Sequence, residues 1–141
     1  MKRLIPVLLF LSLLCGYAQT KAKVFVGDIE GPDPFINERF KMLFLEELGK
    51  VKSVELVDTK EVAQYLLSGI GRVDTQRRAV VLGGIAGAGE VNNALLSIKI
   101  TNPDGQILFV SNKSGVGGRK GASHNTVIAI VKDMKKQLKW K

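Results

Sequence analysis

The sequence predicts an α/β (α+β) fold, in which helices pack on a single mixed β-sheet of about five strands. Three observations carry this prediction. Strand-like and helix-like segments alternate in the first half of the chain, a β-hairpin pattern follows, and an amphipathic segment closes the chain. The expected order is β-α-β-α-β-β-β-α. The 141 residues contain no long linker, so we expect a single domain at 19–141 behind a leader at 1–18.

The first 18 residues have the three-part layout of a secretory signal peptide. Met1–Arg3 is basic, Leu4–Leu14 is an almost unbroken apolar run, and Gly16 and Ala18 are small residues at the −3 and −1 positions of a cleavage site. The apolar run is shorter than the roughly 20 residues that span a bilayer. We therefore predict cleavage after Ala18 and an exported, periplasmic chain that begins near Gln19.

Cys15 leaves a second processing route open. A bacterial lipoprotein is cleaved just before such a cysteine and acylated on it, which would anchor this domain to the outer membrane. The residue before that cysteine is then small, whereas here it is Leu14. Each buried CH₂ group of an acyl chain contributes about 0.8 kcal/mol to membrane binding. We favour cleavage after Ala18 and keep lipidation of Cys15 as the alternative.

The first strand and helix are predicted from local chemistry. Lys23–Asp28 contains β-branched and aromatic residues and no breaker, which is typical of a strand. Asp33 is suited to cap a helix whose first residue is Pro34, since the missing N–H costs nothing there. Gly49 is expected just past the helix end, at the C′ position. Between these ends the apolar residues recur at helical spacing and form one face: Ile36, Phe40, Leu43, Phe44 and Leu48.

The middle of the chain predicts two short strands separated by a short helix. Val54–Val57 is the first of these strands. Asp58 is expected to begin the helix, whose buried side would be Val62, Ala63 and Leu66. Leu67–Val73 is the next strand, in which Gly69 and Gly71 indicate a bulge or a close approach of another backbone.

Residues 94–111 predict a β-hairpin, because apolar residues alternate with polar ones and Asn102–Gly105 is a strong turn signal. Leu96, Ile98 and Ile100 are expected to share its buried face. Ala79–Gly89, which is apolar, glycine-rich and uncharged, is expected to be an inter-strand loop. A second glycine-rich loop at 115–121 is expected before a final helix that Ser123 caps, with an apolar stripe of Val127, Val131, Met134 and Leu138.

Composition restricts the partners and the chemistry. The formal charge is +8, of which Lys2 and Arg3 in the leader contribute two. A basic surface outside the cytoplasm favours anionic partners such as phospholipid, lipopolysaccharide or cell-wall polymers. Nucleic acid is not expected, because the stacked aromatic residues of single-strand binders are missing.

Cys15 is the single cysteine and His124 the single histidine, so we predict no disulfide, no metal site and no cofactor.

The sequence lacks a catalytic constellation. It contains neither the G-x-S-x-G nucleophile elbow nor a phosphate-binding glycine motif. Asp28 and Glu30 would be the acid/base pair of an enzyme, but helix capping and surface solvation explain this acidic stretch more simply. We therefore predict that the protein is not an enzyme.

An ordered set of segments resembles a known group of envelope domains. Val24–Val26 leads into an amphipathic helix, and Val62–Gly69 is similar to the run A-D-Y-x-L-x-G that enters a strand. A glycine-rich segment at 83–89 precedes Leu95–Thr101, and Pro103–Leu108 is similar to the hairpin pattern D-x-x-G-x-x-L. These segments resemble the periplasmic α/β domain shared by curli assembly lipoproteins (CsgG type), lipoprotein activators of penicillin-binding proteins, and the amino-terminal domain of the Tol-system propeller protein.

The resemblance covers most of residues 23–140 and implies an envelope domain that binds proteins. Two features depart from it. Gln64 stands where the family often has an acidic residue, and the residues before Cys15 form a poor lipobox, although lipid anchoring is usual in two of these groups. The chain is also short for the membrane-spanning hairpins of a curli-type pore. A secretion channel is therefore not expected.

We predict a non-enzymatic, exported cell-envelope accessory or adaptor protein that binds another envelope component, in an oligomeric secretion or outer-membrane assembly. Its partner would be an envelope protein or further copies of the chain, with membrane-surface contact as an option. The expected partner-binding residues are Val80, Val81, Leu82, Gly83, Gly84, Ile85, Gly87 and Gly89. The alternative is a soluble periplasmic binder of anionic ligands or surfaces. It would use the basic C-terminal helix and a basic loop with Arg119, Lys120 and Ser123.

Overall fold

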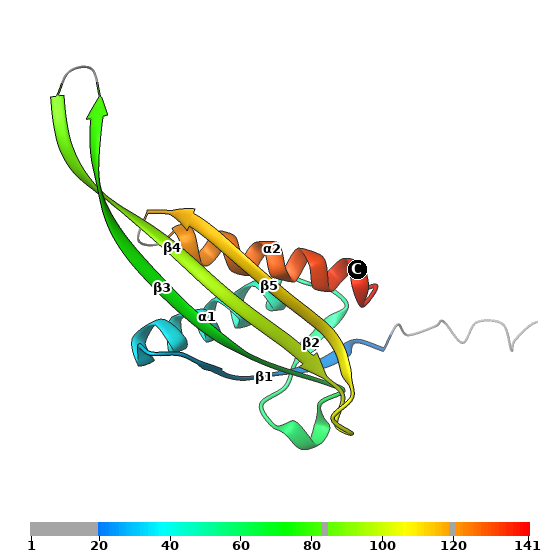
Figure 1. Cartoon of the computed structure of the whole chain (residues 1–141). Helices are drawn as coiled ribbons and strands as arrows, with labels where there is room; N and C mark the ends of the chain where they lie inside the picture. The colour runs from blue at the N-terminus through cyan, green and yellow to red at the C-terminus, as the bar shows by residue number, and fades with distance from the viewer. Residues whose placement is uncertain (1–19, 83–84, 119–120) are drawn as a thin grey trace, which may run out of the picture.

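The computed structural model describes residues 20–82, 85–118 and 121–141, and the side chains of these residues outside 78–88. The predicted signal peptide, its cleavage site and Cys15 lie outside the described residues. The elements in chain order are β1 (Ala22–Glu30), α1 (Pro34–Gly49), β2 (Val54–Leu56), the 3₁₀ turn η1 (Lys60–Val62), β3 (Tyr65–Leu82), β4 (Ile85–Thr101), β5 (Ile107–Gly117) and α2 (Gly121–Gln137) (Figure 1).

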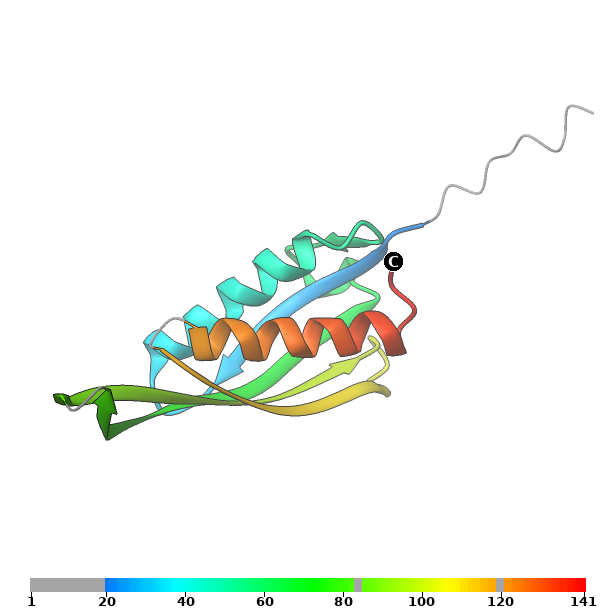
Figure 2. The ribbon, with the colours of Figure 1, turned by 90° about the horizontal axis from the view of Figure 1, so that it is seen from above.

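One five-stranded sheet, ordered β2-β1-β3-β4-β5, organises the molecule. β1 runs parallel to both β2 and β3, whereas β3, β4 and β5 are successively antiparallel. Both helices cover the same face of the sheet, and no helix of the described residues lies on the opposite face (Figure 2). The prediction of a single mixed sheet with helices packed on it is confirmed.

The core lies between the two helices and the covered face of the sheet. α1 contributes Phe40, Phe44 and Leu48, all with no exposed surface. The sheet contributes four side chains that are at most 3% exposed: Leu67, Leu96, Ile98 and Ile100. α2 contributes three with no exposed surface: Val127, Ile130 and Met134. Burying one such side chain stabilises the fold by about 1.5–3 kcal/mol. The helical and strand periodicities in the sequence therefore predicted the buried faces correctly.

The start of α1 is as predicted, but its end is not. The Asp33 carboxylate accepts hydrogen bonds from the backbone N–H groups of Phe35 and Ile36, at 2.9 and 3.4 Å. Gly49 is the last helical residue rather than the C′ residue, and Lys50 caps the helix in a right-handed conformation at φ −79°. The helix ends without the left-handed residue that Gly49 was expected to supply, because the Lys50 and Val51 N–H groups bond to carbonyls of the last turn.

The predicted short helix after Asp58 is wrong. Only Lys60–Val62 forms a 3₁₀ turn, and Ala63 is already extended. The Gln64 N–H donates to the Lys23 carbonyl at 2.9 Å, which draws this segment into parallel pairing with β1. Of the three expected buried residues, Ala63 is 4% exposed, Val62 is 52% exposed, and Leu66 belongs to β3.

The expected loop at Ala79–Gly89 is also wrong, because β3 and β4 continue through it as paired strands. Ala79 faces Ala88 across the ladder, and Leu82 faces Ile85. β3 is therefore 18 residues long instead of ending at Val73. β-Branched residues in this stretch suit a strand, and cross-strand bonds satisfy its backbone. Gly83 and Gly84 lie outside the described residues.

The hairpin at 94–111 is confirmed. β4 and β5 pair across it, and the Gly105 N–H donates to the Asn102 carbonyl at 3.0 Å, with Gly105 at φ 83°. β5 then continues to Gly117, into the segment expected to be a second loop. α2 begins at Gly121, so Ser123 lies inside its first turn and does not cap it. Arg119 and Lys120 lie outside the described residues.

Candidate functional site: a projecting hairpin and an uncovered sheet face

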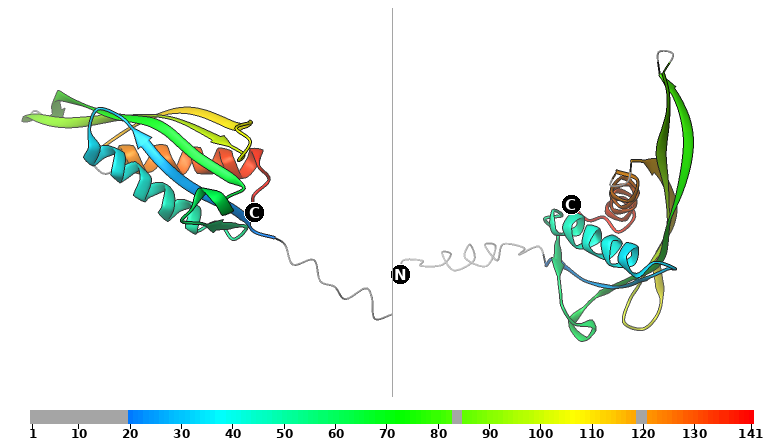
Figure 3. Two further views of the ribbon diagram at one scale, coloured as in Figure 1. Left: turned by 90° about the horizontal axis from the view of Figure 1, so that it is seen from below. Right: turned by 90° about the vertical axis from the view of Figure 1, so that its left-hand side faces the viewer.

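The ends of β3 and β4 extend beyond the rest of the sheet. The pairing of β1 with β3 ends at Ile70, and β5 ends at Gly117, opposite Asn92. Residues 76–82 and 85–91 therefore pair only with each other, and we call this two-stranded ribbon the arm. Figure 1 and the right-hand view of Figure 3 show it reaching past the helices.

The root of the arm is held by specific side-chain contacts. Thr75 Oγ1 donates to Asn92 Oδ1 at 2.7 Å, and Asn92 is 2% exposed. Two residue pairs further out, Arg77 stands directly opposite Glu90 in the antiparallel register. Opposite charges at directly facing positions stabilise a strand pair by a few tenths of a kcal/mol. The hydrogen bond between Thr75 and Asn92 ties the two strands together where the arm begins.

The arm beyond its root carries no charged side chain between Ala79 and Gly89. An isolated two-stranded hairpin is at best marginally stable in water. Both edges of the arm also present backbone N–H and C=O groups that no third strand satisfies, which makes them templates for further pairing. The arm is therefore the part of the described molecule most suited to contact a partner.

The predicted partner-binding residues fall on this arm. Val80, Val81 and Leu82 belong to β3, while Ile85, Gly87 and Gly89 belong to β4. Val80 faces Gly87 and Leu82 faces Ile85 in the register, so the structure brings the two halves of the set together. Their role in binding stays a prediction.

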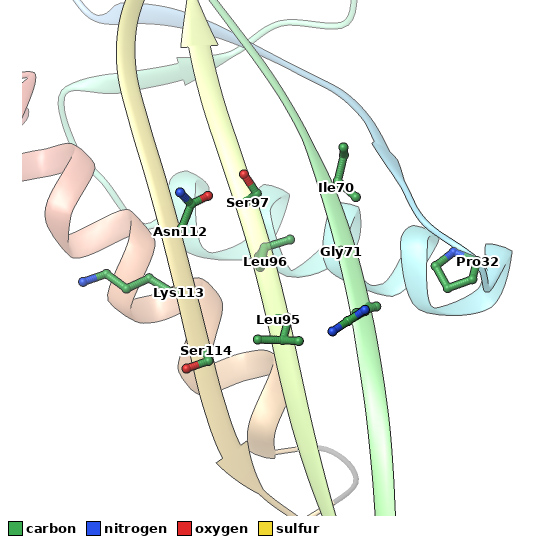
Figure 4. Close-up of a pocket in the computed structure, with 10 residues that line it drawn as sticks. Pro32, Ile70, Gly71, Leu95, Leu96, Ser97, Asn112, Lys113 and Ser114 are labelled. Carbon is green, nitrogen blue, oxygen red and sulfur yellow. The ribbon is translucent and has the colours of Figure 1, made fainter.

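The sheet face without helices is a second candidate surface. Ile70, Val110 and Val116 are 62%, 54% and 64% exposed on the described chain. A shallow hollow of about 650 Å³ lies next to them, lined by Leu95 and Ile70 and by the polar side chains of Arg72, Ser97, Asn112 and Ser114 (Figure 4). No residue of this surface was predicted as a site; Val110 and Val116 stand at alternate positions of β5, on the face opposite the buried Phe109.

The predicted anion site is divided by the structure. Ser123 is 2% exposed, so its side chain is buried at the start of α2. The lysines of the C-terminal segment lie at the other end of this helix of 17 residues, which is about 25 Å long. Ser123 and the basic C-terminal segment therefore do not form one surface.

Asp28, one of the two residues expected in an acid/base pair, forms an ion pair instead. Its carboxylate, expected to act together with Glu30, accepts a hydrogen bond from Lys41 Nζ at 3.1 Å, and its side chain is 87% exposed.

Neither helix in the described part of the chain is long and apolar enough to cross a lipid bilayer.

A separate cluster joins Glu46, Glu47 and His124, whose ligand atoms lie within 4.8 Å of one another. Lys50 Nζ lies 3.0 Å from Glu46 Oε1 and 2.6 Å from Glu47 Oε1, so an ammonium group already occupies the place of a cation. The hydrogen bond from Lys50 is the main reason that the pKa of Glu47 is lowered; partial burial opposes it, and His124 adds to it. This arrangement is an ion-pair cluster that links α1 to α2.

Comparison with known proteins identifies related folds but no family. No protein-family model and no curated protein matches the sequence. Among solved structures, PelC from Paraburkholderia phytofirmans, a dodecamer, superposes with a TM-score of 0.62 at 13% identity, over 79% of this chain and 86% of that one. A variant PelC dodecamer gives 0.57 at 15% identity, over 85% and 88%. A minor lipoprotein from Acinetobacter baumannii gives 0.45 at 10% identity, over 83% and 91%.

At these identities the likeness concerns the fold. It extends over most of both chains, so the sheet and its two helices form an architecture that this protein shares with PelC. The resemblance to the curli assembly group stays a prediction.

Proposed function

We propose that this protein is a non-enzymatic, exported cell-envelope component that works by assembling with further copies of itself, the arm of one copy docking on the next. The observation that carries this proposal is the arm, a paired ribbon from Gln76 to Val91 that leaves the sheet without a third strand. A head-to-tail contact between an arm and a different surface of the neighbouring copy generates a closed ring when the rotation closes.

Three observations support the proposal. The leader at 1–18 has the layout of an export signal. The fold is shared with PelC, which forms dodecamers. The uncovered sheet face offers an exposed apolar surface around Ile70 and Val110, against which an uncharged arm would lose water on both sides. An accessory or adaptor role toward a further envelope component follows from such an assembly.

The test is the mass of the assembly in solution when the arm is shortened. Ala79 and Ala88 face each other in the register, so Val80–Gly87 can be replaced by Asn-Gly, which forms a two-residue hairpin turn. Light scattering after size exclusion should give a multiple of the chain mass for the natural protein and the mass of one chain for the shortened form. A natural protein that is monomeric over a wide concentration range contradicts the proposal.

A second variant separates the length of the arm from its apolar character. Replacing Val80, Val81, Leu82 and Ile85 by threonine keeps the length and the strand preference of the arm but removes apolar surface. We expect this variant to assemble at least tenfold more weakly than the natural protein. Full assembly of both variants would show that the arm is only a connector.

A further inference from the structure

Lysines from three distant segments gather at the end of the molecule opposite the arm. Lys21 precedes β1, Lys52 lies between α1 and β2, and Lys141 is the last residue; together with Ser53 they line one shallow hollow of about 200 Å³. Figure 2 shows the start of β1 and the C-terminus at this end, with the arm at the other. Three lysine side chains therefore line this hollow, and no acidic side chain lines it.

Backbone hydrogen bonds hold these segments together. The Lys141 N–H donates to Ser53 Oγ at 2.7 Å, and the Ser53 N–H donates to the Lys141 carbonyl at 3.3 Å. The Ala22 N–H donates to the Ser53 carbonyl at 2.7 Å. Ser53 thus joins the beginning and the end of the domain, so the positions of the three lysines are fixed by the fold.

The end of α2 extends the same charged region. Lys135 and Lys136 are exposed in its last turn, and Lys139 follows in a left-handed conformation at φ 55°. This turn directs the Trp140 side chain, which is 6% exposed, back into the core, and the Trp140 backbone N–H donates to the Lys135 carbonyl at 3.0 Å. Trp140 therefore anchors the segment that carries Lys139 and Lys141.

We define the lysine pole as Lys21, Lys52, Lys135, Lys136, Lys139 and Lys141, all of which are exposed. Among the residues that the structure describes, none of the six forms an ion pair, whereas the nearby Lys50 is paired with two glutamates. Like charges that gather without forming ion pairs repel one another in an isolated domain. A surface of this kind is suited to a negatively charged partner.

The path of the chain indicates which anionic partner fits. The described domain begins at Thr20, immediately before Lys21, so residues 1–19 connect to the molecule at the lysine pole. If Cys15 were acylated, the anchored chain would therefore present this end to the membrane. From this placement and the unpaired charge, we infer that the lysine pole docks on a surface of anionic phospholipid, with the arm directed away from the bilayer. Basic residues close to anionic lipid add to binding approximately one by one.

The inference is tested by partition into lipid vesicles. The full chain carries Cys15→Ser, so that no lipid is attached at that position. Vesicles with about a third of phosphatidylglycerol in phosphatidylcholine are compared with phosphatidylcholine alone, which measures any binding by the leader. We expect at least tenfold stronger partition into the anionic vesicles, decreasing as salt screens the charges.

A pair of matched variants locates the binding surface. Lys21→Gln, Lys52→Gln and Lys141→Gln together should reduce partition into anionic vesicles at least tenfold. Lys41→Gln, Lys60→Gln and Lys113→Gln remove the same charge outside both the lysine pole and the arm, and should reduce it less than threefold. Equal losses for the two variants would mean that only net charge matters, and equal binding of the natural chain to both kinds of vesicle would mean that anionic lipid is not recognised. Either result overturns the inference, and neither bears on assembly through the arm.

Discussion

His124, in the first turn of α2, lies 3.1 Å from Glu47 of α1, measured from Nε2 to Oε1. The same Glu47 oxygen lies 2.6 Å from Lys50 Nζ, and the Glu47 side chain is only 13% exposed. One carboxylate therefore links the two helices that cover the sheet. His124 and Glu47 are 77 residues apart in the chain, so their contact reports directly on the packing of α2 against α1.

The lowered pKa of Glu47 predicts a pH-dependent contribution to stability. The folded state favours the ionised carboxylate, so the stabilisation is present above the ordinary pKa of about 4.3 and is lost as the pH falls through the lowered folded value. Glu47→Gln should reduce the free energy of unfolding by about 0.5–1 kcal/mol at pH 7 and by less at pH 3. Urea denaturation at the two pH values measures this difference.

Glu46→Gln is the control for this prediction, because Glu46 contacts Lys50 but its side chain is 57% exposed. We expect it to change the free energy of unfolding by less than about 0.5 kcal/mol at both pH values. A cost of Glu47→Gln that is the same at pH 3 and pH 7 would show that the carboxylate charge does not stabilise the fold.

Gly71 allows α1 to pack closely on the sheet. A Cβ at this position would lie 2.7 Å from Phe40 Cδ2 and 3.0 Å from Leu96 Cδ1, and both neighbours are buried. Gly71→Ala should therefore lower the free energy of unfolding by about 1–3 kcal/mol through overpacking. Chemical denaturation is the measurement. Gly118→Ala, where a Cβ meets nothing within 4 Å, should be close to neutral.

The crowding at Gly71 can be relieved from the other side of the contact. Phe40→Leu on its own leaves a cavity and destabilises the protein. Combined with Gly71→Ala, it should cost less than the two single changes together, since the added methyl group fills part of the space. Strict additivity in this double-mutant cycle would refute the close contact between the two residues.

Trp140 anchors the C-terminus through its ring. It stands edge-on to Tyr65, with ring centroids 5.2 Å apart and an interplanar angle of 87°. Its indole N–H is buried without a hydrogen-bond partner among the described residues. Trp140→Ala should lower the free energy of unfolding by about 3 kcal/mol. Trp140→Phe keeps an aromatic ring and removes the unpaired donor, so it should cost less than about 1.5 kcal/mol. Equal losses for the two variants would exclude ring packing as the cause.

Much of the fold was predictable because it depends on neighbouring residues. Asp33 and Pro34 start α1 independently of what the helix packs against, and Asn102–Gly105 turns the chain between β4 and β5. The alternation of Leu96, Ile98 and Ile100 similarly identifies a buried strand face without knowledge of its neighbours. The close approach of another backbone expected at Gly71 is confirmed by Gly31, where an added Cβ would meet the Gly71 carbonyl oxygen.

The candidate site was predictable only in part. The sequence indicated that residues 79–89 are unusual, because they are apolar and uncharged, but the same composition is compatible with a loop and with paired strands. The pairing of Ala79 with Ala88 and of Val80 with Gly87 determined the strand form. Ser123 was expected to cap α2 because the first helical residue was placed at 124, three residues late, and its burial follows from the earlier start at Gly121.

The sequence alone therefore determined the fold class, the start of α1, the β4–β5 hairpin and the buried faces, since each depends on contacts within a few residues. Tertiary structure alone decided that an arm projects from one end and that lysines collect at the other. The arm exists because β1 and β5 stop before β3 and β4 do. The lysine pole exists because Ser53 bonds to Lys141 across 88 residues, and such pairing depends on the path of the whole chain.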